Sequence, residues 1–395
     1  MVWEVRSRNL PAGVVEEERP LMDLIDFGLI VLRVVATFVL LLVVTPMNIW
    51  AERKLLADMQ NRVGPDRAGP WGLLQSFADA IKLFFKEQVL PTKAEKWMFL
   101  SAPIFAVVPA FLLFMVVPWG APLTFTIDGV ERVVPLQGTD LNVGVLFILA
   151  MSSMAVYAVV LAGWSSGSKY PLLGGVRATA QAISYEAALG LSIVAVVLYS
   201  STAGDTGGGT LSLAGIVERQ SGTLEAVLPQ FGAITQFIPR WNLIPQFVAF
   251  VIFVVAAIAE TNRAPFDLVE AEQELVGGFH TEYSGSKFLL FFLAEYVNIF
   301  SMSALAATLF LGGWNGPTFD SILPGFLSAA MPTVWLLIKT YLIVFVFIWV
   351  RATLPRMRYD QLMTLGWKRL IPGALGWLIV SALVIGIRRF GLPFV

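Results

Sequence analysis

The stretch FLLFFLAEYVNIFSMSALAATLFL, residues 288–311, decides the fold of this chain. It is as long as the roughly 20 residues that a helix needs to cross the hydrocarbon core of a bilayer, and its only charged side chain is Glu295. The stretch is apolar around most of its circumference, so it has neither the alternation of a strand nor the narrow seam of a coiled coil. It predicts a membrane-spanning helix with one carboxylate at membrane depth.

Seven further runs of the same character predict a bundle of about eight spans. Together with 288–311 these are residues 27–50, 97–119, 141–164, 182–203, 241–262, 332–350 and 371–387, of which the last is short. The chain is 57% hydrophobic and only 14% charged, whereas an ordinary soluble domain has roughly 25% charged residues. We expect an all-α integral membrane protein with a single transmembrane domain, residues 23–395, preceded by an external N-terminal tail, residues 1–22.

Lysine and arginine are unevenly distributed between the two sets of connecting loops. Loops 51–96, 165–181, 261–287 and 351–370 together hold 17 of them, and the opposite set with both terminal segments holds 8. Cytoplasmic loops carry the excess of these residues in membrane proteins. The first set is therefore predicted to be cytoplasmic, with both termini on the outer side.

The composition excludes several kinds of redox or metal site. The chain has no cysteine, so it cannot ligate an iron–sulfur cluster through thiolates or form a disulfide. Its single histidine, His280, cannot by itself make a metal site, and we interpret it as a polar loop residue. The net charge of −1 argues against nucleic acid as a partner.

The segment 71–87 predicts an amphipathic helix in the plane of the membrane. It is too short and too charged to cross a bilayer, and Leu74, Phe77, Ile81 and Phe84 recur on one helical face. A passive interfacial anchor would explain that face alone. The preceding turn NRVGPDRAGP, residues 61–70, carries Arg62 and two Gly-Pro pairs, and it favours a portal for an amphiphile that enters from the lipid.

Several glutamates are predicted to lie within or at the ends of spans, where burying an ionised carboxylate costs free energy. Glu186 and Glu295 fall within spans, and no lysine or arginine lies within one helical turn of either. Glu52 and Glu260 fall at the cytoplasmic ends of spans, where Glu52, beside Arg53, also fits an ordinary interfacial charge group. Exchange of protons by buried carboxylates is the property expected of a relay.

The loop at residues 260–286, ETNRAPFDLVEAEQELVGGFHTEYSGS, is acidic. A loop on the cytoplasmic side, where it is predicted to lie, would be expected to be basic. The loop contains six carboxylates and one basic residue, Arg263. A solvated acidic loop would account for the charge alone. The apolar residues within the loop, among them Phe266, Leu275 and Phe279, favour a loop folded back against the protein.

Four segments of this chain resemble one family. AERKLLADMQNRVGPDRAGPWGLLQSFADAIKLFFKE (51–87) and AETNRAPFDLVEAEQELVGGFHTEYSGSKFLLFFLAEY (259–296) are similar to the signature segments of the H subunits of proton-translocating NADH:quinone oxidoreductase, respiratory complex I. RATAQAISYE (177–186) and RATLPRMRYDQLMTLGWK (351–368) add to the likeness, which spans roughly residues 25–390. Trp71 stands where the family motif leads us to expect tyrosine. The N-terminal tail and the 204–240 loop are longer than the family minimum.

The resemblance implies a role for each of the residues singled out above. Those that would line or support the membrane side of a quinone chamber are Glu52, Arg53, Arg62, Phe77, Asp79, Arg263, Phe266 and Asp267. Those that would form a proton relay from the chamber into the membrane are Glu186, Glu260, Glu270, Glu272, Glu274, Glu282 and Glu295. None of them would be directly redox-active, and no metal is expected.

The resemblance also implies the surroundings of the chain. It would be a non-redox subunit of a translocase in a bacterial inner membrane, with quinone, either menaquinone or ubiquinone, as substrate. Partner subunits of the membrane arm and of the quinone module would adjoin it, and FMN and iron–sulfur clusters would belong to those partners. The alternatives are the equivalent subunit of a membrane-bound hydrogenase and a stand-alone proton or cation transporter. A transporter would be expected to show an inverted repeat, and the sequence shows none.

The orientation predicts which loops an external reagent can reach. Single cysteines introduced at Asp66 and Met357 should resist a membrane-impermeant thiol reagent in intact cells and react in inverted vesicles, since the chain has no cysteine of its own. Labelling of either position from outside would reverse the predicted topology.

Overall fold

The computed structural model describes residues 24–127, 130–201, 210–222, 239–267, 275–317 and 325–390. In these ranges, seven helical segments are long and apolar enough to cross a membrane. They are α1 (Leu24–Met59), α3 (Lys96–Met115), α4 (Gly144–Ser165), α5 (Lys169–Ser201), α9 (Ser286–Phe310), α10 (Gly325–Thr353) and the continuous run from α11 into α12. The predicted all-α, multi-pass membrane fold is confirmed.

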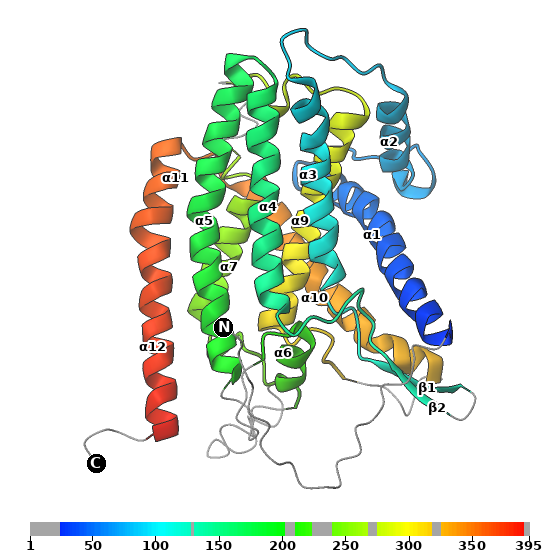
Figure 1. Ribbon diagram of the computed structural model, residues 1–395, viewed down its shortest axis with the longest axis vertical. Helices are drawn as coiled ribbons and strands as arrows, with labels where there is room; N and C mark the ends of the chain where they lie inside the picture. The colour runs from blue at the N-terminus through cyan, green and yellow to red at the C-terminus, as the bar shows by residue number, and fades with distance from the viewer. Residues whose placement is uncertain are drawn as a thin grey trace, which may run out of the picture.

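The bundle is arranged around α9 (Figure 1). α3 packs against both α4 and α9, α4 against α5, and α5 against α12, while α10 packs on α9. α1 and α12 lie at opposite edges of the bundle, and α1 and α10 run obliquely to α4 and α5. The two edge helices bury the smallest shares of their surface within the chain, so most of each faces outward.

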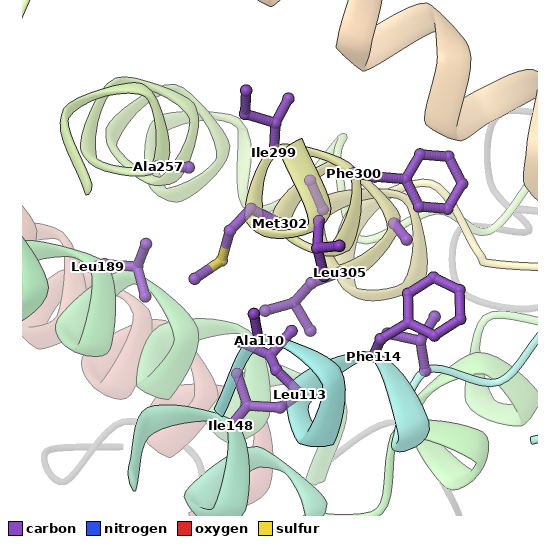
Figure 2. Packing of buried hydrophobic residues seen from close by; sticks show 14 of the residues in the cluster. Ala110, Leu113, Phe114, Ile148, Leu189, Ala257, Ile299, Phe300, Met302 and Leu305 are labelled. Atoms are coloured by element: carbon purple, nitrogen blue, oxygen red, sulfur yellow. The ribbon is translucent and has the colours of Figure 1, made fainter. Parts of the chain in front are cut away.

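The core is centred on the C-terminal half of α9, where small side chains let its neighbours approach. Residues 301–307 read SMSALAA, and every one of them is buried. Helices inside a bilayer gain little from hydrophobic transfer and associate through close packing instead, which small residues permit. Figure 2 shows the side chains that meet there: Ala110, Leu113, Phe114, Ile148, Leu189, Ala257, Ile299, Phe300, Met302 and Leu305.

The fifth predicted span, 241–262, is helical only over α7 (Phe247–Glu260). At about 1.5 Å per residue a helix of this length falls short of the roughly 30 Å hydrocarbon core. Turns occupy residues 242–246, around Pro245. The amide of Asn242 donates to the oxygens of Leu309 at 2.9 Å and Ser200 at 3.2 Å. Such buried partners allow irregular backbone within a membrane bundle.

The last span is longer than the predicted 371–387. α11 (Tyr359–Leu365) continues through a π-helical turn, Gly366–Leu370, into α12 (Ile371–Phe390). α5 likewise begins at Lys169 rather than at residue 182. The sequence criterion located the apolar stretch of each helix and missed the polar turns that extend it.

Shorter elements cap the two ends of the bundle. The predicted amphipathic helix is present as α2 (Gln75–Phe85), after the 3-10 turn Pro70–Gly72, and Phe77, Ile81 and Phe84 are exposed on it. α6 (Leu213–Arg219) packs on α9. An antiparallel hairpin that the sequence did not predict, β1 (Leu123–Ile127) with β2 (Val130–Val134), is tied to α1 by an ion pair between Arg132 and Asp26.

The N-terminal extension of α5 contacts the second half of the acidic loop. A Cβ atom on Gly174 would come within 2.7 Å of the Cα of Gly278 in the 3-10 turn Gly278–His280. Only a glycine leaves room for that turn, so the loop is held against the helix by close backbone contact.

This contact predicts opposite outcomes for two glycines of one helix. Gly174→Ala should destabilise the protein by about 1–3 kcal/mol, because the loop must move away from the new methyl group. Gly190→Ala should be neutral or stabilising by up to about 1 kcal/mol, since nothing lies within 4 Å of its Cβ position and alanine favours a helix. Thermal unfolding of both variants in detergent tests this pair, and equal midpoints would contradict the close contact.

Candidate functional site

A cluster of four charged side chains joins α1, the loop after α7, α9 and α10. Arg263, in the loop after α7, places Nη1 at 3.4 Å from Oε1 of Glu52 on α1 and Nε at 2.8 Å from Oε1 of Glu295 on α9. Arg351, near the end of α10, also pairs with Glu52. The cluster has no net charge, and the Arg263 guanidinium lies 4.5 Å from the ring centre of Tyr296.

Burial gives these contacts their importance. Arg263 and Glu52 are 8% and 6% exposed. A charge removed from water to this degree is retained only when partners compensate for the lost hydration. Glu52 and Arg263 therefore depend on the partners around them, and the four side chains come from segments far apart in the sequence.

A second ion pair joins the amphipathic helix to the bundle. Arg53 on α1 pairs with Asp79 on α2, and Gln75 also donates to Asp79, at 3.1 Å. Burial by itself raises the pKa of Asp79, but the Arg53 hydrogen bond and charge, with Gln75 and Lys82, outweigh it and hold that pKa below its usual value. Asp79 is thus an ionised anchor for α2 at neutral pH.

A third ion pair fixes the first half of the acidic loop. Asp267 accepts from Arg356 at 2.9 Å, and the backbone N–H of Met357 donates to the carbonyl of Pro265 at 3.0 Å. The loop after α7 is thereby tied to the segment that follows α10. Phe266, between these contacts, is buried against the ring of Tyr185 at a centroid distance of 5.4 Å.

Deeper in the bundle, a cavity of about 110 Å³ lies between α3, α4, α5, α7 and α9. Its lining is mostly apolar, with Glu260, Glu295, Ser152, Asn262 and His280 among its polar members. A space of this size holds several water molecules, since one needs only about 10–15 Å³ measured in this way.

Two carboxylates near this cavity are bonded to neighbouring serines of α4. The hydroxyl of Ser152 donates to Glu260 and that of Ser153 donates to Glu186. The second oxygen of Glu260 is buried and has no protein partner among the described residues. Glu295, in contrast, is held by the Arg263 guanidinium.

The structure brings together only part of the set predicted from the sequence. Glu52, Arg263 and Glu295 form the cluster, Arg53 pairs with Asp79, and Glu186 and Glu260 meet at α4. Arg62 and Phe77 are exposed away from these contacts, and Glu282 lies half-buried in the turn before α9. Glu270, Glu272 and Glu274 lie outside the described residues.

Sequence reasoning missed the side chains that complete the site. Arg351 is the first residue of the quoted segment 351–368. Because a buried Glu52 needs a basic partner, the sequence contained a signal for this arginine that the prediction did not use. Nothing in the run GVLFILAMSSMAVYAVVLAG marks Ser152 and Ser153 as more than small polar residues of a span. Within the described ranges, no group of three or more His, Asp or Glu side chains is placed to hold a metal ion.

These features define a class of protein: a polytopic helical membrane protein with a buried charge cluster at one end and carboxylates leading from it into the bundle. A family model described as NADH dehydrogenase matches residues 32–382, and the chain belongs to that family. It is 51% identical over 358 residues to the H subunit of NADH-quinone oxidoreductase from Frankia alni, covering 90% of this chain and 72% of the relative. The corresponding protein of Frankia casuarinae is 50% identical over the same shares.

His280 predicts a pH dependence of stability. Burial lowers the pKa of His280 from 6.5 to about 4, although the charge of Asp267 opposes the shift. The unfolded chain therefore binds more protons than the folded chain between these two values, and stability must fall as the pH falls through that window. The loss should reach at most about 2 kcal/mol near pH 5 relative to neutral pH.

The measurement is thermal unfolding in detergent from about pH 7.5 to about pH 5. In His280→Gln, which cannot ionise, the decrease with falling pH should be smaller than in the unmodified protein. Parallel curves for the two proteins would show that His280 does not carry this dependence.

Proposed function

We propose that this chain is the H-type membrane subunit of a proton-translocating NADH:quinone oxidoreductase, that it forms the membrane side of the quinone chamber, and that it couples quinone reduction to proton transfer. The observation that carries this proposal is the chain of ion pairs from Glu52 through Arg263 to Glu295, which lines the cavity together with Glu260. The likeness to the Frankia proteins supplies the reaction.

The chamber side of the site is the junction of α1, α2 and the loop after α7. Arg53 and Asp79 hold α2 against α1, and the apolar face of α2 points away from the bundle. A quinone tail is apolar and its headgroup is polar. An interfacial helix with such a face, anchored by an ion pair, suits the entry of this molecule from the lipid.

Arg263 is the element that can transmit a change of charge. It contacts one carboxylate on the chamber side and one on the cavity side, at 3.4 Å and 2.8 Å. Reduction of quinone by two electrons creates anionic oxygens that take up protons. At about 4 Å and an effective dielectric constant near 20, a unit charge changes the energy of a neighbouring charge by about 4 kcal/mol. A change of this size near Glu52 alters the hold of Arg263 on Glu295.

The remaining assignments follow from the same proposal. The loops that contain residues 51–96 and 261–287 face the cytoplasm, both termini face outward, and the membrane is a bacterial inner membrane. The electron carriers, FMN and iron–sulfur clusters, belong to partner subunits of the quinone module, and other membrane-arm subunits adjoin this chain. Quinone is the substrate, and the chain itself undergoes no redox change.

Glu186→Gln tests the coupling role most cleanly. Glu295 is a poor choice, because its loss also removes a partner of the buried Arg263. Gln keeps the shape of Glu186 and its capacity for hydrogen bonds but cannot ionise. The variant complex should assemble, while NADH:quinone activity and proton pumping in sealed vesicles should fall together by at least about tenfold.

Glu218→Gln on α6 is the matched control, because Glu218 is exposed at the other end of the bundle. It should keep full activity, and electron transfer from NADH to an artificial acceptor upstream of quinone should be normal in both variants. An assembled Glu186→Gln complex that pumps at the normal rate would refute the relay.

A further inference from the structure

We propose that Ser152 and Ser153 of α4 form a hydroxyl link through which a proton passes between Glu260 and Glu186. The inference rests on the proposed function, since it specifies one step of that proton path. One proton leaves the carboxylic acid of Glu260, one arrives at the carboxylate of Glu186, and both serines end as they began. Two residues adjacent in the sequence thus connect carboxylates of two other helices, α7 and α5.

The geometry of the two hydrogen bonds carries the proposal. Ser152 is 6% exposed and donates to Oε1 of Glu260, and Ser153 donates to Oε1 of Glu186. Adjacent residues of a helix point in directions about 100° apart, so the pair presents one hydroxyl to α7 and one to α5. Both carboxylates therefore converge on a single turn of α4.

Ser153 has a second acceptor, and this lets it reverse its role. Its hydroxyl lies 3.0 Å from the backbone carbonyl oxygen of Leu149 as well as in contact with Glu186. A serine hydroxyl carries one proton and two lone pairs. When Glu186 is ionised, Ser153 donates to it. When Glu186 is protonated, Ser153 can donate to Leu149 and accept from the acid.

Ser152 lies where water can reach the Glu260 end of the link. It lines the cavity of about 110 Å³ together with Glu260, whose second oxygen is buried without a protein partner among the described residues. That oxygen is a site for a water molecule, and a buried water typically makes about three hydrogen bonds to such groups. The path runs through neutral hydroxyls, with the cavity at its Glu260 end, in contrast to the guanidinium contacts of the Arg263 cluster.

The test compares variants that differ only in the hydroxyl groups. Val has the shape of Thr but no hydroxyl, so the native complex would be prepared with Ser152→Val/Ser153→Val and, separately, with Ser152→Thr/Ser153→Thr. In sealed vesicles the Val pair should lose at least about tenfold in kcat for NADH:quinone reduction, with pumping falling in parallel and the KM for quinone unchanged. The Thr pair should retain most of the wild-type kcat. Equal rates for the two pairs would overturn the proposal.

Ser192→Ala on α5 controls for the loss of any buried serine, since Ser192 is 1% exposed and donates to the carbonyl of Leu189 on its own helix, at 2.6 Å. It should leave kcat unchanged. If the Val pair does not assemble, the smaller Ser152→Ala/Ser153→Ala pair replaces it. A normal kcat in that pair would equally overturn the proposal, because neither hydroxyl would then be needed.

Glu260→Gln and Glu186→Gln, measured in parallel, separate this proposal from the one it rests on. Loss of turnover in both Gln variants with normal turnover in the Val pair would refute the serine link and leave the carboxylate relay standing. Normal turnover in both Gln variants would refute the relay and the link with it. Loss in the Gln variants and in the Val pair, with rescue by Thr, is the expected result.

Discussion

The interior of this protein depends on one buried guanidinium. Arg263 lies between Glu52 and Glu295, and Arg351 completes the pairing of Glu52. Removal of one partner from a buried ion pair typically costs about 3–5 kcal/mol, because the other charge is left without compensation. The positions of α1, α9 and α10 and of the loop after α7 are therefore set by one group of charges as well as by packing. The same dependence makes the group responsive to any new charge beside it.

The two ends of the bundle differ in the kind of polar side chain that they bury. At the end that holds α6, the side-chain amide of Gln220 donates to the carbonyl of Thr308 on α9 and accepts from the backbone N–H of Asn242, and the side-chain amide of Asn242 donates to the carbonyl of Leu309. A buried cation there, Lys339, donates to the carbonyl oxygens of Gly313 and Asn315 at 2.9 and 2.6 Å. Amides neither gain nor lose protons at ordinary pH. At the opposite end the groups are carboxylates and arginines beside a cavity, so that end is the one suited to chemistry that moves protons.

The sequence predicted those parts of the structure that depend on local composition. Long apolar runs such as 288–311 are helices because a backbone in lipid must bond to itself, and that rule applies residue by residue. The helix prediction was wrong at residues 241–246. There Asn242 hydrogen-bonds to residues of α5 and α9, and no local sequence pattern reveals such long-range partners. The site divides in the same way. Glu295 was conspicuous in the sequence as a lone charge in a span. Its pairing with Arg263, and that of Glu52 with Arg351, which lies 299 residues further along the chain, depend on the tertiary fold.

The carboxylates are stabilised by two kinds of partner, and the difference bears on what each can do. A guanidinium only donates and carries a fixed positive charge, so it favours the charged form of Glu52 and Glu295. A serine hydroxyl donates to a carboxylate or accepts from a carboxylic acid, so Ser152 and Ser153 accommodate Glu260 and Glu186 in either state. In the proposed coupling, Glu52 and Glu295 therefore respond to a change of charge in the chamber, and Glu260 and Glu186 can change protonation without an unpaired ion being left behind. A device that converts a charge change into proton movement needs both properties in this order.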